Sequence, residues 1–394
     1  MVHITSDNAE TQNILEQLCT KIEECGGSIH PNARIACHHH AIQISVTGED
    51  AEGPLFQIPH EALVVYDDFA LKIEDGLIKT HSTVDGIAPV QRDLMELILA
   101  LYNVTGKLQA HLDSSAWHVF KDDPEILRLL QLGRQGGDAQ MIAQFIKDGM
   151  YEELALLTFF KTRLLNCQLY KKDAPMEMVL MPLADLMDHT LKGAIYKQLY
   201  YEGGATLNVP LSRPVEGSNE CFMSYGAFDS FDTYLHYNFI DAQTPFVRSV
   251  PVNINLGEWG QIDIRALNAH VPTHDIPEGF KDLSFYMPII NIHESERRAV
   301  LSHLMIPGRA APKSLRRILS LTLQSLHPTI NAEHIKILML QVEDLLLKAN
   351  LAYYNDLEAA VRDSYTKDTK KDLLTTLIAR QHEILGFYAE ISAA

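Results

Sequence analysis

A carboxylate and an imidazole stand side by side at Asp188 and His189, just after the apolar stretch MEMVLMPL at 176–183. At the end of a buried segment, such a pair either stabilises a kink or forms part of a functional site. Further imidazoles follow one another in CHHH at 37–40. Imidazole nitrogens and a carboxylate together form ligand sets for transition metals, so metal binding is one chemistry open to these residues. The elements that carry the side chains decide which chemistry is feasible.

Hydrophobic periodicity predicts a chain of mixed α and β structure. Residues 11–24 carry apolar side chains at helical spacing and end before a Gly-Gly pair, as a helix does. Short β-like runs follow from about 33 to 66. Residues 91–177 are mostly helical in character, and this block interrupts the β-rich part. Strand-like runs separated by glycine, proline and asparagine resume over 176–267.

From about 292 to its end the chain shows only helical patterns. Residues 333–347 place apolar side chains on one helical face, and Asn355 with Glu358 forms a capping box that predicts the start of a further helix. We therefore expect an α+β protein in three parts. They are a β-rich core at 1–90 and 178–282, a helical insertion at 91–177 and an all-helical domain at 283–394.

Composition and charge restrict the kind of partner. With 394 residues the chain can form two or three domains. Its formal net charge of −18 repels phosphate backbones, which argues against nucleic acid and favours a basic protein partner. No stretch reaches the roughly 20 apolar residues that span a bilayer, so we expect no membrane association. Scattered cysteines and the lack of a secretory signal indicate reduced thiols and a cytoplasmic protein.

Three stretches of the sequence can be compared with known families by their order and their spacing. They are PLFQIPHEALVV at 54–65, MPLADLMDHT at 181–190 and ECFMSYGAFDSFDTYLHYNFID at 220–241. In this order they resemble the SET-domain family, in particular its branch related to the Rubisco large-subunit lysine methyltransferase. That branch carries an I-P strand, then P-x-x-D-x-x-N-H, then S-Y-G, with Y-G-F eleven residues after the glycine. Here Tyr237 stands eleven residues after Gly226.

The resemblance covers nearly the whole chain, since the helical insertion and the C-terminal helices also fall where this branch carries them. It implies a SET-like core threaded in a pseudoknot. It also implies S-adenosylmethionine as cofactor and transfer of a methyl group to a lysine of a protein substrate. By the same resemblance, Tyr237 matches the catalytic tyrosine whose hydroxyl orients amine and methyl group. Tyr225 matches the aromatic residue of S-Y-G near the same channel.

Further residues match the cofactor side of this family. Asp188 and His189 stand at the N-H pair that borders the cofactor. Arg163 stands where the branch has an arginine ahead of its P-x-x-D strand. His40 and Ile42 stand where the family has a glycine-rich G-x-G. The resemblance therefore implies a cofactor site formed around these positions.

The chain departs from the family pattern at several of these positions. Asp188 replaces an asparagine, and its carboxylate can pair with the ammonium of the cofactor. The sequence His-Ala-Ile at 40–42 replaces glycines that let the cofactor approach the backbone. Asn238 replaces the glycine that follows the tyrosine at 237. These departures leave functions other than methyl transfer open.

Two alternatives belong to other classes of function. If the fold is right, residues 37–40, Asp188, His189 and His236 converge on the cofactor side and could hold iron or zinc. Consecutive side chains of a strand point to opposite faces, so at most two of the three neighbouring histidines could share such a site. The other alternative is a non-catalytic SET-like protein that binds a peptide. S-adenosylmethionine-dependent N-methylation of a protein lysine, without a metal site, is the primary prediction.

Overall fold

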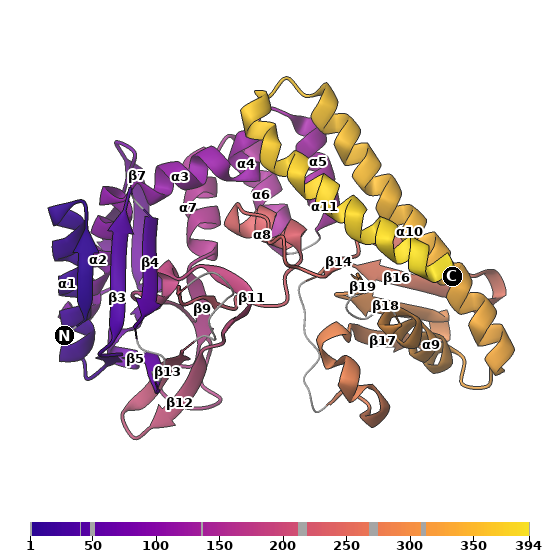
Figure 1. The fold of residues 1–394 in the computed structure, drawn as a ribbon, viewed down its shortest axis with the longest axis horizontal. Coiled ribbons are helices and arrows are strands. Elements are labelled where there is room, and N and C mark those ends of the chain that lie inside the picture. The colour runs from indigo at the N-terminus through magenta and orange to yellow at the C-terminus, as the bar shows by residue number, and fades with distance from the viewer. Residues whose placement is uncertain are drawn as a thin grey trace. The chain divides into compact units, whose positions relative to one another are not determined.

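The computed structural model describes residues 2–39, 41–47, 52–134, 137–211, 219–267, 275–308 and 313–393. The chain divides into two compact units, each of which combines two stretches of the sequence. Unit 1 consists of Met1–Asp113 with Met150–Ala227, and unit 2 of Ser114–Gly149 with Phe228–Ala394. Their helices and strands are labelled in Figure 1.

The first sheet of unit 1 has the order β1-β3-β4, with β1 parallel and β4 antiparallel to β3. Its strands are β1 (His3–Ser6), β3 (Ala33–His38) and β4 (Ala41–Val46). Buried residues alternate with more exposed ones along β3 and β4, so one face of the sheet lies in the core. Helix α1 (Ala9–Glu24) packs beside β1 and begins at Asn8, whose side chain accepts hydrogen bonds from the first turn.

Further sheets and a hairpin complete the described β structure of unit 1. Their strand orders are β12-β13-β5-β2, β6-β10-β9 and β7-β8. Their strands are β2 (Ser28–Ile29), β5 (Pro54–Pro59), β6 (Val64–Val65), β7 (Phe69–Glu74), β8 (Leu77–Thr83), β9 (Leu164–Cys167), β10 (Glu177–Leu180), β12 (Lys197–Tyr201) and β13 (Gly204–Pro210). Strand β11 (His189–Ala194) lies outside these sheets and forms isolated bridges to Met223. The remaining helices are α2 (Pro89–Val104), α3 (Lys107–Ser114) and α7 (Tyr151–Lys161), with 3-10 helices η1 (His60–Ala62), η2 (Tyr66–Asp68) and η3 (Ala184–Leu186).

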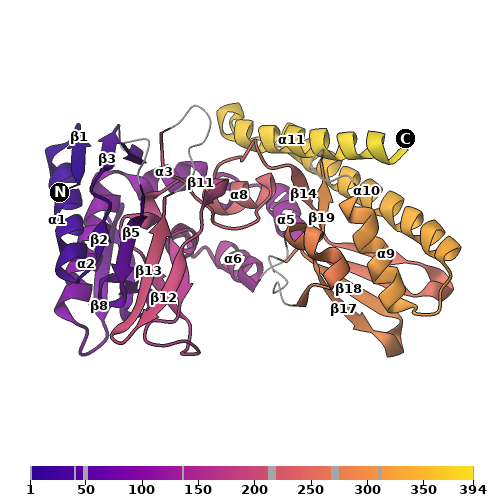
Figure 2. The same cartoon turned by 60° about the horizontal axis from the view of Figure 1, so that its bottom comes forward.

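Unit 2 contains a four-stranded sheet of order β15-β16-β18-β17 and a two-stranded ladder of β14 with β19. The strands are β14 (Phe246–Arg248), β15 (Val252–Asn255), β16 (Gln261–Arg265), β17 (Ile289–His293), β18 (Arg298–Ser302) and β19 (Met305–Pro307). The helices are α4 (Ala116–Val119), α5 (Pro124–Gly133), α6 (Gly137–Asp148), α8 (Ser230–Tyr237), α9 (Ser314–Leu326), α10 (Ala332–Asp363) and α11 (Asp368–Ala393), with 3-10 helices η4 (Gly257–Trp259), η6 (Glu278–Tyr286) and η7 (Glu294–Glu296). The long helices α10 and α11 lie side by side in both views (Figures 1 and 2).

The expected α+β fold class is confirmed, because helices and short strands alternate along the chain and long helices form its C-terminal part. The expected strand at 220–226 forms isolated bridges instead of a regular strand. The expected helical block at 91–177 also contains β9. The boundaries between the units, after Asp113, Gly149 and Ala227, fall inside the expected parts. Among the described residues, no helix is long and apolar enough to cross a bilayer.

The expectation of an all-helical chain from 283 onward is wrong in its first part. Strands β17, β18 and β19 lie there, within 289–307. Nearly every residue of β18 and β19 is buried, so the alternation that marks a half-exposed strand is absent. Their partners β16 and β14 come from earlier in the chain, and only the tertiary fold supplies them.

The capping box at Asn355 and Glu358 does not begin a helix. Helix α10 runs unbroken from Ala332 to Asp363, and buried residues such as Tyr354 and Leu357 continue its packed face through this point. A capping interaction contributes only about 1 kcal/mol, whereas burial of a large apolar side chain contributes about 1.5–3 kcal/mol. Packing of the continuous face therefore outweighs the local signal.

Candidate functional site

The segment 220–225 of unit 1 lies between strands β4 and β11. On one side the Cys221 N–H donates a hydrogen bond to the Ile44 carbonyl oxygen at 2.7 Å. On the other side the Ser224 N–H donates to the Ala194 carbonyl oxygen at 2.8 Å. The segment that carries S-Y-G is therefore held by backbone hydrogen bonds to two strands that are far apart in the sequence.

Gly193 in β11 permits this close passage. An added Cβ at this position would lie 2.6 Å from the Met223 carbonyl oxygen and 2.7 Å from the Ser224 nitrogen. Beside it the Met223 N–H donates to the Asp188 carbonyl oxygen at 2.9 Å. Any side chain at 193 would displace the segment, so a glycine is required here for space.

His189 and Tyr225 are in direct contact. The backbone N–H of Tyr225 donates to Nδ1 of His189 at 3.0 Å, and the two rings stack with centroids 4.9 Å apart. The Tyr225 hydroxyl donates to the Met187 carbonyl oxygen. Since Nδ1 accepts a hydrogen bond, the neutral imidazole carries its proton on Nε2. The imidazole of the D-H pair and the aromatic ring of S-Y-G thus form one rigid contact.

Asp188, which precedes His189 in the chain, affects the ionisation of other charged groups of unit 1. The side chain of Asp188 is exposed, yet the neighbouring protein reduces the hydration of its carboxyl group and raises its pKa, while the ammonium of Lys107 opposes the rise. Loss of hydration and the negative charge of Asp188 raise the pKa of Glu220 to about 7. Burial and the like charge of Arg163 lower the pKa of Lys107.

Arg163 follows the end of helix α7 and is held on several sides. Its guanidinium lies over the ring of Phe159, with Cζ 3.7 Å from the ring centroid. Nη1 donates to the Phe159 carbonyl oxygen and to Thr162 Oγ1, both at 2.7 Å. Burial raises the pKa of the nearby Asp185 carboxyl, which accepts the Tyr102 hydroxyl, and the charge of Arg163 opposes this rise. Arg163 is therefore a positive charge held in a fixed position.

Of the positions that replace the family's glycines, Ile42 lies in strand β4, where it pairs with Cys37 of β3. His38 pairs with Ala41, and His39 adopts a left-handed conformation with φ of 48°. Ile42 is 4% exposed and packs in the core of unit 1, so its side chain does not lie in an open cavity. His40 lies outside the described residues.

Tyr237 belongs to unit 2, where it is the last residue of helix α8. Its ring lies near that of Phe228, with centroids 5.7 Å apart. Burial raises the pKa of the Tyr237 hydroxyl, which therefore stays protonated at neutral pH and can donate a hydrogen bond. Asn238 follows in the left-handed conformation with φ of 61°, which suits glycine best and asparagine next. The replacement of the family's glycine by Asn238 is thus compatible with the backbone.

A buried charge quartet holds helix α8 in unit 2. Its members are Arg134, Asp229, Asp232 and Arg248. Arg134 donates to Asp229 Oδ2 at 2.7 Å and to Asp232 Oδ1 at 2.8 Å, and Arg248 donates to Asp232 as well. Asp229 and Asp232 also form a capping box at the start of α8. Burial alone would raise the pKa of Asp232, but the two guanidinium groups lower it.

The described residues do not support the metal alternative. Among them, no group of three or more histidine, cysteine, aspartate or glutamate side chains is arranged to hold a metal ion. The His39 side chain is 98% exposed, while His189 is buried. His236 lies in unit 2 and Asp188 in unit 1.

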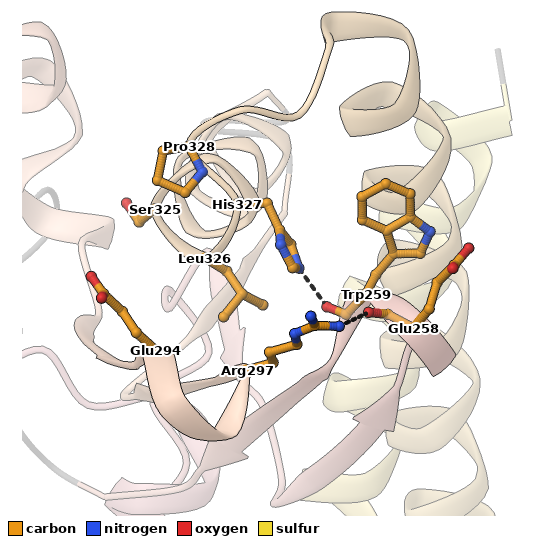
Figure 3. Close-up of a pocket in the computed structure, with 8 residues that line it drawn as sticks. All are labelled: Glu258, Trp259, Glu294, Arg297, Ser325, Leu326, His327 and Pro328. Carbon is orange, nitrogen blue, oxygen red and sulfur yellow. Dashed lines mark hydrogen bonds between the residues drawn. The ribbon is translucent and has the colours of Figure 1, made fainter.

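Unit 2 carries a pocket of about 470 Å³ (Figure 3). Trp259 and His327 line it together, with the His327 Nε2–H donating to the Trp259 carbonyl oxygen at 2.7 Å. Arg297 Nη1 donates to the Glu258 carbonyl oxygen at 3.2 Å. Because these interactions use backbone acceptors of the same loop, they stabilise η4. None of the residues predicted for the site lines this pocket.

Sequence reasoning missed Lys107 and Glu220 in unit 1 and the charge quartet in unit 2. Lys107 begins a helix, where a lysine normally faces solvent, and Glu220 precedes an apolar run without any motif. No local pattern distinguishes these residues from ordinary surface charges. Their environment is formed by segments that are distant in the sequence.

Comparisons with known proteins give matches among solved structures only. No protein-family model matches the chain, and no curated protein matches it. The SET domain of LSMT bound to lysine and AdoHcy has 13% sequence identity and a TM-score of 0.39, with 97% of this chain and 91% of that chain covered. The same domain bound to MeLysine and AdoHcy has 14% identity and a TM-score of 0.38 over 96% and 91%. Rubisco LSMT bound to sinefungin and monomethyllysine has 14% identity and a TM-score of 0.37 over 96% and 90%.

Proposed function

We propose that the chain is a SET-type, S-adenosylmethionine-dependent N-methyltransferase that acts on a lysine of a basic protein in the cytoplasm. The observation that carries the proposal is the contact between two motifs named from the sequence. His189 of the D-H pair and Tyr225 of S-Y-G share a 3.0 Å hydrogen bond and a stacked ring contact. The SET pattern requires such a meeting of its two motifs, and the passage beside Gly193 permits it.

The donor set of unit 1 fits the amino-acid end of the cofactor. Arg163 would supply a positive charge for its carboxylate, and Asp188 would supply a negative charge for its ammonium. His189 and Tyr225 supply an aromatic wall beside these charges. When bound, S-adenosylmethionine supplies the electrophilic methyl group. Ile42 is buried in the core of unit 1, which supports the proposal that its side chain leaves this place open.

Methyl transfer needs a neutral amine, whereas a free lysine has a pKa of about 10.4. A channel with little water lowers that pKa, because burial disfavours the charged form. In the proposed reaction the Tyr237 hydroxyl donates or accepts one hydrogen bond that aligns the amine. Most of the rate enhancement then comes from alignment and from the exclusion of water.

The test has two measurements. Calorimetry with S-adenosylmethionine and S-adenosylhomocysteine measures cofactor binding, and mass spectrometry of basic proteins mixed with enzyme and cofactor measures methylation. Replacement of Tyr237 by Phe is expected to lower turnover about a hundredfold, as loss of one positioned hydroxyl group does, while the melting temperature is kept. Full activity of this variant would refute the role of Tyr237. Absence of cofactor binding would refute the proposal as a whole.

A non-catalytic binder is the second candidate. The sequence His-Ala-Ile at 40–42, which lacks the glycines of the family, is the observation that favours it. Binding of a basic protein without methyl transfer under any cofactor concentration would decide for this candidate.

A further inference from the structure

The pocket of about 470 Å³ in unit 2 is formed by two neighbouring loops and by the end of a helix (Figure 3). The first loop is η4, between β15 and β16, and the second is η7, between β17 and β18. The Gln261 N–H donates to the Arg297 carbonyl oxygen at 2.9 Å, and an added Cβ at Gly260 would collide with the same oxygen. The two loops are therefore packed closely together, and the volume between them falls in the range of ligand sites, about 300–1,000 Å³.

An apolar base and an aromatic wall line this pocket. Leu326, the last residue of helix α9, is 7% exposed and forms the base. The rings of Trp259 and His327 meet edge to face, with centroids 5.4 Å apart, and the His334 ring lies 5.7 Å from the indole. The His327 Nε2–H donates to the Trp259 carbonyl oxygen at 2.7 Å, which holds both residues in place. Because Trp259 is only half-buried, its indole offers a surface against which a planar group can pack.

The charged side chains of the pocket carry a negative balance. Glu258 and Glu294 are exposed on opposite sides of it, and Arg297 lies between them in the view of Figure 3. None of these three side chains forms an ion pair with another residue that the structure describes, whereas the neighbouring Glu296 lies 3.3 Å from Arg298 Nε. Arg297 is held instead by its Nη1 group, which donates to the Glu258 carbonyl oxygen at 3.2 Å.

The end of helix α9 adds to this negative balance. The helix runs for 13 residues, and Ser325, Leu326 and His327 at its C-terminus line the pocket. The last carbonyl groups of a helix carry partial negative charge and favour cations. Two carboxylates and a helix C-terminus outweigh one guanidinium group, so the pocket favours a cation over an anion.

We propose that this pocket binds an arginine side chain of a basic protein partner. A guanidinium group is planar, carries several N–H donors and stacks on aromatic rings, which matches a carboxylate beside an indole. In this assignment the guanidinium pairs with the Glu294 carboxylate and packs against Trp259, while its aliphatic stem covers Leu326. The assignment concerns the pocket of unit 2 alone and does not depend on the proposed methyl transfer.

Tryptophan fluorescence of the full chain tests the assignment directly. Of the two tryptophans, Trp117 is 4% exposed, whereas Trp259 lines the pocket. An acetylated and amidated peptide of glycine, serine and arginine, without lysine, is expected to change the emission of Trp259. The same peptide with citrulline in place of arginine, which keeps the shape but loses the charge, is expected not to bind. The emission change is expected to be absent from Trp259→Phe.

Variants of the charged residues test the sign of the pocket. Glu294→Gln is expected to weaken binding of the arginine peptide about threefold, the size of an ion pair near the surface, and Glu294→Asp to retain most of the affinity. Glu390→Gln, the matched control, removes an exposed carboxylate of unit 2 outside the pocket and is expected to bind as the parent chain does. Arg297→Asn, at a left-handed position that accepts asparagine, is expected to bind at least as tightly as the parent chain, because a repelling charge is removed.

Several outcomes would overturn the assignment. They are the absence of an emission change with the arginine peptide, a change that persists in Trp259→Phe, and equal affinities of Glu294→Gln and the parent chain. Inorganic phosphate provides the opposite probe: if phosphate binds and its binding is lost in Arg297→Asn, while the arginine peptide does not bind, the pocket accepts anions instead. Each of these outcomes leaves the proposed function standing, because none involves the cofactor or Tyr237.

Discussion

At the scale of single residues, the proposed function rests on His189 and on its contact with Tyr225. Asp188 and His189 were recognisable as a pair in the sequence, and Tyr225 and Tyr237 by their spacing. Lys107 was not, because its half-buried surroundings are created by the fold. Asn238 is the opposite case. In the sequence, the replacement of the family's glycine by asparagine argued against the family's function, but the left-handed backbone at this position accepts asparagine.

Glu220 makes a testable contribution to the pH dependence of stability. In the folded chain its proton is retained up to about pH 7, whereas the ordinary value is 4.5. Between these pH values the folded state binds more protons than the unfolded one, so the free energy of unfolding falls as pH rises. Replacement of Glu220 by Gln is expected to reduce that fall, as measured by urea denaturation between pH 5 and 8. The effect is modest, since the side chain is only partly buried.

Glu202→Gln, an exposed change in the same unit, serves as the control and is expected to follow the parent curve. Identical pH profiles for Glu220→Gln and the parent chain would contradict the assignment.

At the scale of elements, the contact between the segment 220–225 and β11 depends on one glycine. Gly193→Ala is expected to lower the free energy of unfolding by at least about 2 kcal/mol, because the added methyl group collides with backbone atoms that cannot rotate away. Urea denaturation measures the loss. Gly203→Ala is the control, because an added Cβ there meets no atom within 4 Å. Equal stabilities of the two variants would show that the segment does not pass Gly193 closely.

The charge quartet gives a second prediction at this scale. Arg134→Ala leaves Asp229 and Asp232 buried with too little positive charge, which is expected to cost about 3–5 kcal/mol of unfolding free energy. Arg128→Ala removes an exposed arginine that pairs with Glu125, and is expected to leave the free energy of unfolding nearly unchanged. Chemical denaturation of both variants checks the contrast. A small loss in Arg134→Ala would mean that the quartet does not hold helix α8.

At the scale of the whole molecule, the net charge of −18 governs encounters with partners. A lysine-rich peptide is expected to bind at least tenfold more weakly at 0.5 M salt than at 0.05 M, because the screening length shrinks from more than 10 Å to only a few ångströms. Fluorescence anisotropy measures the affinities, and an acidic peptide of the same length should not bind. Salt-independent binding of the basic peptide would argue for a contact dominated by apolar surface.

The amino-acid sequence by itself determined what depends on neighbours along the chain. Apolar periodicity predicts helices α1, α2 and α10. The net charge argues against nucleic acid and favours a basic partner, and residue types at fixed spacing identify the candidate motifs. Only the tertiary structure decided which distant groups meet. The buried strands β18 and β19, the passage beside Gly193 and the burial of Arg134 all depend on partners far away in the sequence. Burial and pairing energies arise from contacts in space, and a linear pattern does not contain them.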